Sequence, residues 1–212
     1  PRSGTTALGR ILSSIDGFSM IYEPFNLNQG IKDIQFNYPY PGKNISIKQF
    51  QSIFNNLIQF KSSFKKGYLK NDSTAKRIFK TFFGNESSLS YFKAKKSLST
   101  NQLLIKDPFL LFSSKELCLN HKVIICYRPL MPLAASFKRM KWDFKEFEDL
   151  INFFPRNSIK SFRFKASDKI SSNVVGAIQF YELFYNYIKS INPNKNLYFF
   201  SQQKFSTDPI EE

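Results

Sequence analysis

Short apolar runs alternate along the chain with segments in which apolar residues recur every three or four positions. Four runs rich in β-branched and aromatic residues predict strands, at 18–22, 102–105, 122–127 and 197–200. Each run is almost continuously apolar, which is typical of strands in a parallel sheet that is covered on both faces.

Helical spacing marks most of the intervening segments. It predicts long helices over 5–16, 47–60, 130–140, 142–154 and 174–191, and shorter ones around 73–83, 87–95 and 109–117. Strands that alternate with helices in this way indicate the α/β class, with a parallel sheet flanked by helices on both faces. At 212 residues the chain is long enough to bury one substantial core, so we expect a single domain over 1–212.

Loops are predicted where Gly, Pro, Asn and Ser gather. Residues 26–45 read as a loop whose Tyr38 and Tyr40 either cover the core, the interpretation we favour, or stack on a sugar or another ring-shaped acceptor. Residues 156–172 are basic and rich in Ser, which predicts a surface loop. Pro24 favours an extended backbone at the residue before it, Glu23.

Charged residues follow three of the predicted strands directly. Glu23 comes after the first, Lys106 and Asp107 after the second, and Arg128 after the third. In open α/β sheets the working site lies outside the carboxyl ends of the strands. We therefore expect these residues to share one edge of the sheet with the loop that contains Arg2.

The first six residues have the pattern of an anion-binding loop that opens a helix. Gly4 allows a tight turn and a close approach, while Thr5 and Thr6 supply hydroxyls and amides at the helix start. Arg2 adds a planar fork of donors that suits phosphate or sulfate. The Walker A spacing and its Lys are absent.

Composition narrows the classes of partner. Lys and Arg total 31 against 16 acidic residues, and this net charge of +15 indicates an anionic partner. The basic residues are spread along the chain, which does not favour nucleic acid. With one His and two separated Cys, no metal site is predicted. No apolar run is long enough to span a membrane.

The anion loop and a second motif, Arg128 with Ser136 eight residues later, together resemble the PAPS-dependent sulfotransferases. PAPS is 3′-phosphoadenosine 5′-phosphosulfate. The resemblance implies a P-loop NTPase-like sulfotransferase fold and the transfer of a sulfuryl group from PAPS to a hydroxyl or amine, without a metal. The acceptor would be a carbohydrate, a lipid-linked molecule or a small molecule. In that family the loop matching Arg2, Ser3, Gly4, Thr5 and Thr6 binds the 5′-phosphate end, and the residues matching Arg128 and Ser136 bind the 3′-phosphate.

The resemblance also suggests catalytic residues. Glu23 stands where tyrosylprotein and several bacterial sulfotransferases carry a catalytic Glu, which makes it the candidate base; the alternative is a structural salt bridge between Glu23 and a nearby Arg or Lys. Lys106 would reach the bridging oxygen or the sulfonate, or would be a strand-end lysine in solvent. The His that other branches use is replaced here by Asp107, which is an alternative base or a residue that orients Lys106. Residues 26–100 correspond to the variable part of the family, which would select the acceptor.

The family's first strand precedes its anion loop, and further helices follow its last strand. We therefore expect a chain truncated at both ends, with any leader lost and with the cytoplasm favoured as its compartment. Gln202 and Gln203 replace an acidic pair of the family, so an inactive relative is one alternative. A basic polyanion-binding protein is the other. The sequence predicts neither the acceptor nor the oligomeric state.

Overall fold

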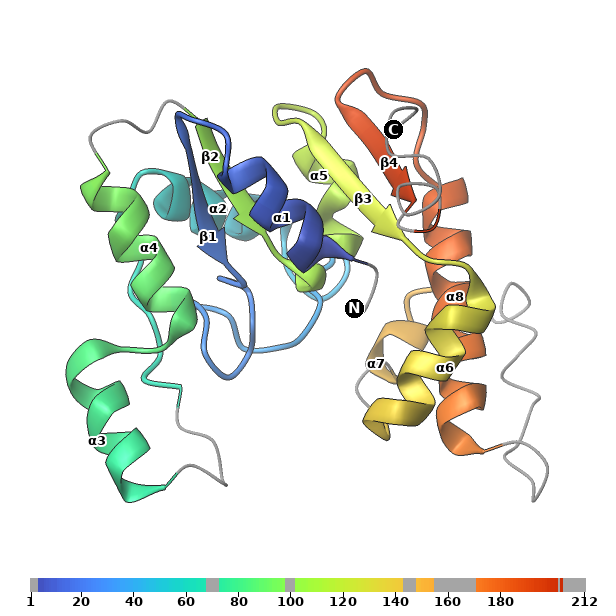
Figure 1. Ribbon diagram of the computed structural model, residues 1–212. Coiled ribbons are helices and arrows are strands. Elements are labelled where there is room, and N and C mark those ends of the chain that lie inside the picture. The colour runs from blue at the N-terminus through green and yellow to red at the C-terminus, as the bar shows by residue number, and fades with distance from the viewer. Residues whose placement is uncertain are drawn as a thin grey trace. The chain divides into compact units, whose positions relative to one another are not determined.

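Helices and short parallel strands make up the structure, a computed structural model that describes residues 4–67, 73–97, 102–142, 148–154, 171–201 and 203 (Figure 1). The α/β class is confirmed. The chain divides into two compact units: unit 1 covers Thr5–Ser113, and unit 2 covers the chain from Ser114 onward. None of the described helices is both long and apolar enough to cross a membrane.

Unit 1 contains most of the elements predicted for the first half of the chain. Its elements are α1 (Thr5–Ser13), β1 (Phe18–Tyr22), α2 (Ile47–Ile58), α3 (Thr74–Phe83), α4 (Glu86–Lys96), β2 (Gln102–Lys106) and the 3-10 helix η1 (Pro108–Ser113). The first helix ends earlier than predicted because the Ser13 and Ser14 hydroxyls donate back to main-chain carbonyls of its last turn.

Unit 2 begins where the expected helix over 109–117 divides into η1 and a separate short helix. Its elements are α5 (Ser114–Leu117), β3 (Val123–Tyr127), α6 (Leu130–Met140), α7 (Glu148–Ile151), α8 (Ser172–Lys189) and β4 (Leu197–Ser201). Of the helix expected over 142–154, the described part contains only α7. The predicted basic loop lies almost entirely outside the described residues.

The strands form two separate parallel pairs. Strand β1 pairs with β2, from Phe18 opposite Gln102 to Tyr22 opposite Lys106. Strand β3 pairs with β4, from Val123 opposite Leu197 to Tyr127 opposite Ser201. The parallel direction was predicted correctly, but the described residues form two-stranded sheets in place of one larger sheet. The sulfotransferase fold itself therefore stays a prediction.

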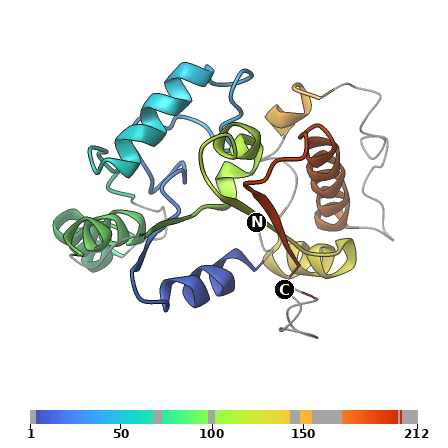
Figure 2. The same ribbon diagram turned by 90° about the horizontal axis from the view of Figure 1, so that it is seen from above.

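In unit 1, helices α1 and α2 lie on opposite sides of the β1–β2 pair, and α4 lies beside β1 (Figures 1 and 2). The apolar face of α2 fills the core, where the Phe25 ring packs 6.0 Å from Phe50 and 6.4 Å from Phe54 between ring centroids. The Tyr38 side chain is buried against Phe109, so it covers the core as we favoured. This packing fixes the loop that follows β1.

Unit 2 is built on contact between α6 and α8. The Phe137 ring of α6 lies 6.1 Å from Phe180 of α8 and 5.8 Å from Trp142, measured between ring centroids. Helix α6 ends at Lys141, whose backbone has the left-handed conformation. The packing of α6 in the core of unit 2 therefore fixes the position of its first turn, which follows β3 in the sequence.

Candidate active site

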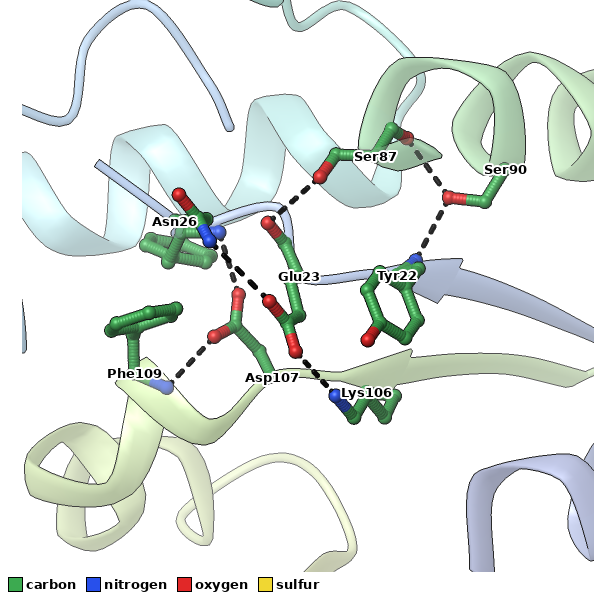
Figure 3. Close-up of polar contacts among 9 residues, drawn as sticks. Tyr22, Glu23, Asn26, Ser87, Ser90, Lys106, Asp107 and Phe109 are labelled. Atoms are coloured by element: carbon green, nitrogen blue, oxygen red, sulfur yellow. Dashed lines mark hydrogen bonds and ion pairs between the residues drawn. The ribbon is translucent and has the colours of Figure 1, made fainter. Parts of the chain in front are cut away.

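Glu23 and Lys106 meet at the carboxyl end of the β1–β2 pair (Figure 3). The Glu23 amide donates to the Lys106 carbonyl over 2.8 Å, which continues the parallel pairing beyond the last strand residue. The Lys106 ammonium lies 2.5 Å from Glu23 Oε1, and the two side chains are only 5% and 18% exposed. The prediction that these two residues share one edge is confirmed.

The Lys106 ammonium is held on a second side by Tyr22, whose ring centroid is 4.2 Å away. Gly9 of α1 makes room for the lysine stem, since a Cβ atom there would lie 3.3 Å from Lys106 Cγ. Within the described part of the chain, the Glu23 carboxylate is the only hydrogen-bond acceptor of this ammonium. Two of its three N–H donors therefore have no protein acceptor among these residues.

Glu23 has a left-handed backbone, with φ of 45°. The extended conformation predicted from Pro24 was therefore wrong. A tight turn overrides the local preference, because the Asn26 amide and the Ser87 hydroxyl each donate to the Glu23 carbonyl over 3.2 Å. Such a conformation costs about 1–3 kcal/mol in a residue with a side chain, and it is found preferentially at functional sites.

Asp107 links the two loops that leave the strands. Its Oδ2 accepts from the Phe25 amide over 2.6 Å, and its Oδ1 accepts from the Phe109 amide over 2.8 Å. Burial raises the pKa of Asp107 from 3.8 to about 7; the two amides and Lys106 act to lower that pKa, whereas Glu23 acts to raise it. Because both carboxyl oxygens are engaged by main-chain amides, the geometry favours a positioning role for Asp107.

The predicted anion loop is described only from Gly4 onward, and Arg2 and Ser3 lie outside the described residues. Gly4 has φ of 88°, a conformation that favours glycine, and Thr5 and Thr6 form the first turn of α1 directly after it. A Gly-led turn into a helix N-terminus suits an anion, because unpaired amides point out of the helix there. The described part of the loop is consistent with phosphate binding.

The second predicted anion site lies in unit 2. Arg128 follows β3 directly and precedes Pro129, the N-cap residue of α6. Ser136 is buried in the middle of α6, with 3% of its surface exposed. The strand-end and helix contexts expected for the two residues are both present.

Sequence reasoning missed a pocket of about 410 Å³ in unit 1. It is lined by Met20, Tyr22, Lys80, Gly84, Asn85, Glu86, Leu89, Ser90 and Lys93. These residues come from β1, the end of α3 and the start of α4, and no local pattern joins them. Tyr22 connects the pocket to the Glu23–Lys106 pair, because its ring lies against the Lys106 ammonium.

Comparisons with known proteins do not assign a family. No family model matches the chain, and searches of curated proteins and of solved structures give no match. The resemblance to sulfotransferases therefore rests on the sequence motifs alone. Among the described residues, no group of three or more His, Cys, Asp or Glu side chains is placed to hold a metal ion.

Proposed function

We propose that this chain is a PAPS-dependent sulfotransferase. The observation that carries the proposal is the Glu23–Lys106 pair, a half-buried acid beside a buried base at the carboxyl end of parallel strands. The left-handed backbone of Glu23 adds to it, because a fold that maintains local strain at a charged residue favours a functional role there.

In this proposal the nucleotide is held by positive charge and main-chain amides. Arg2, Ser3, Gly4, Thr5 and Thr6 bind the 5′-phosphate end, while Arg128 and Ser136 bind the 3′-phosphate. A net charge of +15 favours such a strongly anionic substrate over a neutral one. The acceptor is a hydroxylated or amine-bearing molecule.

The reaction is a direct displacement at sulfur. A lone pair of the acceptor oxygen or nitrogen forms the new O–S or N–S bond, and the bond between sulfur and the 5′-phosphate oxygen breaks, with its electron pair leaving on that oxygen. The acceptor proton passes to the Glu23 carboxylate. The two N–H donors of Lys106 that have no acceptor among the described residues supply positive charge where negative charge develops on the departing oxygen. The products are the sulfate ester or sulfamate and 3′-phosphoadenosine 5′-phosphate (PAP).

Glu23 is a better proton acceptor than Asp107 on geometric grounds. Besides Lys106, the Glu23 carboxylate accepts only one long bond, 3.3 Å from Asn26 Nδ2, among the described residues. Both oxygens of Asp107 already accept short bonds from main-chain amides. A base must reach the proton that it removes, and the two amide bonds of Asp107 hold its oxygens against the loops at Phe25 and Phe109.

Turnover of the Glu23→Gln variant tests this assignment. PAP release from PAPS is followed with hydroxylated aromatic, alkyl and sugar acceptors, and PAP affinity is measured in parallel. We expect Glu23→Gln to lower kcat by about a hundredfold or more with unchanged PAP affinity, since general base catalysis typically contributes that much. Asp33→Asn, a change at an exposed carboxylate of unit 1, should leave kcat unchanged.

One outcome would reject the role of Glu23, and another would reject the proposed function itself. Turnover by Glu23→Gln at the wild-type rate would remove Glu23 from the mechanism. Binding of AMP, ATP and an acidic polysaccharide as tightly as PAP, all weakening steeply with salt, would instead identify a polyanion-binding protein.

A further inference from the structure

The pocket beside β1 shares a wall with the candidate active site. The Tyr22 ring contacts the Lys106 ammonium and also lines the pocket. Ser90 lines the pocket as well, and its hydroxyl accepts from the Tyr22 amide over 2.9 Å, which fixes α4 against the end of β1 (Figure 3). A molecule in the pocket would therefore lie next to the residue that precedes Glu23.

Two polar side chains in the pocket wall, Asn85 and Ser90, are already engaged by hydrogen bonds within the protein. Both N–H donors of the Asn85 amide are used, toward the carbonyls of Gln29 and Lys65 over 2.9 and 2.8 Å, and its oxygen accepts from the Ser88 amide. The Ser90 hydroxyl donates to the Ser87 carbonyl over 2.9 Å.

The lysine in the wall also forms a hydrogen bond with the main chain. Lys80 is buried, and its ammonium donates to the Gly67 carbonyl over 2.8 Å, so that its aliphatic stem is left to line the pocket. The apolar lining is completed by Met20, the Tyr22 ring and Leu89. The exposed charged residues Glu86 and Lys93 belong to the lining as well, and their exposure places their charges toward solvent.

We propose that this pocket binds the apolar body of a hydroxylated acceptor and excludes sugars. This inference rests on the proposed function, and it names the acceptor class within it. A sugar would bring several hydroxyl groups that each need a hydrogen-bond partner, and burying them unpaired would be costly. An apolar body needs no such partners, and a volume of about 410 Å³ is in the range of small-molecule sites.

The test is the direct binding of 2-naphthol, a hydroxylated apolar probe, with methyl β-glucoside as the polar probe, by isothermal titration calorimetry. Leu89→Gln makes the wall polar, and Leu89→Trp fills the pocket without making it polar. Phe92→Gln is the matched control, because Phe92 is 51% exposed on the same helix and does not line the pocket. PAP binding is measured with every chain.

We expect wild type and Phe92→Gln to bind 2-naphthol equally and the glucoside not at all. Both Leu89 variants should weaken naphthol binding by about tenfold or more, the typical effect of disturbing an apolar pocket, with PAP affinity unchanged. Naphthol affinity that is equal in all four chains, or glucoside affinity that matches it in wild type, would overturn the inference.

The two proposals fail in different ways in this experiment. If the Leu89 variants lose naphthol binding but none of the four chains binds PAP, the apolar pocket is upheld and its role as an acceptor site is rejected. PAP binding without naphthol binding would reject the pocket and leave the sulfotransferase proposal standing.

Discussion

Asp107 should make the stability of the protein depend on pH. Its carboxyl group has an ordinary pKa of 3.8, which burial raises to about 7 in the folded chain. Between these values the folded state binds more protons than the unfolded state, so the free energy of unfolding falls as pH rises. The stability that Asp107 contributes to the folded state is fully present below pH 3.8 and is lost as the pH rises through about 7.

The size of the effect follows from the shift. Each pH unit in this window corresponds to about 1.4 kcal/mol, so that Asp107 lowers the free energy of unfolding by at most about 3 kcal/mol between pH 5 and pH 8. This direction is unusual. Amide hydrogen bonds to a carboxylate ordinarily lower its pKa, so that the folded protein loses stability in acid. Here the desolvation of the buried carboxyl outweighs its two amide bonds.

Urea unfolding followed by far-UV circular dichroism at pH 5, 6, 7 and 8 measures this slope, with Asp107→Asn as the comparison. The Asn amide cannot accept from both the Phe25 and Phe109 amides, so the variant should be less stable than wild type at pH 5 by about 1–3 kcal/mol. That difference should shrink or reverse by pH 8. A wild-type stability that is constant or rises over this range, or a slope that persists in Asp107→Asn, would refute the reasoning.

Three further predictions concern stability. Glu23→Gln leaves the buried Lys106 ammonium without its countercharge and should lower the free energy of unfolding in urea by about 3 kcal/mol. Adding Lys106→Met should recover part of that loss. If the effects of the two substitutions simply add, the two side chains do not interact as a pair. Gly30→Ala should lower the free energy of unfolding by about 3 kcal/mol in the same assay, because the added Cβ would lie 2.1 Å from a main-chain carbonyl oxygen. A near-neutral effect would mean that the backbone of this loop shifts to accommodate the methyl group. Phe137→Ala should cost about 3–5 kcal/mol and shift the fluorescence of Trp142, the only tryptophan; an unchanged emission spectrum would contradict their packing.

The sequence predicted the elements that depend on local pattern. All four strands lie where continuous apolar runs were found, and the helices of strong periodicity, such as α2 and α6, begin at the expected residues. The meeting of Glu23 and Lys106 also followed from a general rule, because neighbouring parallel strands bring their carboxyl ends together.

Features that depend on distant contacts could not be predicted. The backbone of Glu23 departs from the preference before Pro24 because a turn and the Ser87 hydroxyl, 64 residues away, hold its carbonyl. The hydrogen bond from the Phe25 amide to Asp107 depends on the position of the loop at Phe25, which local sequence does not specify. The pocket depends on how α3 and α4 pack beside β1, which periodicity does not specify.

Selectivity between PAP and AMP tests the central claim most directly. Calorimetric titration of wild type should give PAP an affinity at least about tenfold above that of AMP, since each hydrogen bond to a charged group contributes about 1.5–3 kcal/mol. The preference should disappear in Arg128→Ala and persist in Arg139→Ala, a change at an exposed arginine of the same unit. Equal affinity for the two nucleotides, or a preference that survives Arg128→Ala, would contradict the assignment of this chain as a PAPS-dependent sulfotransferase.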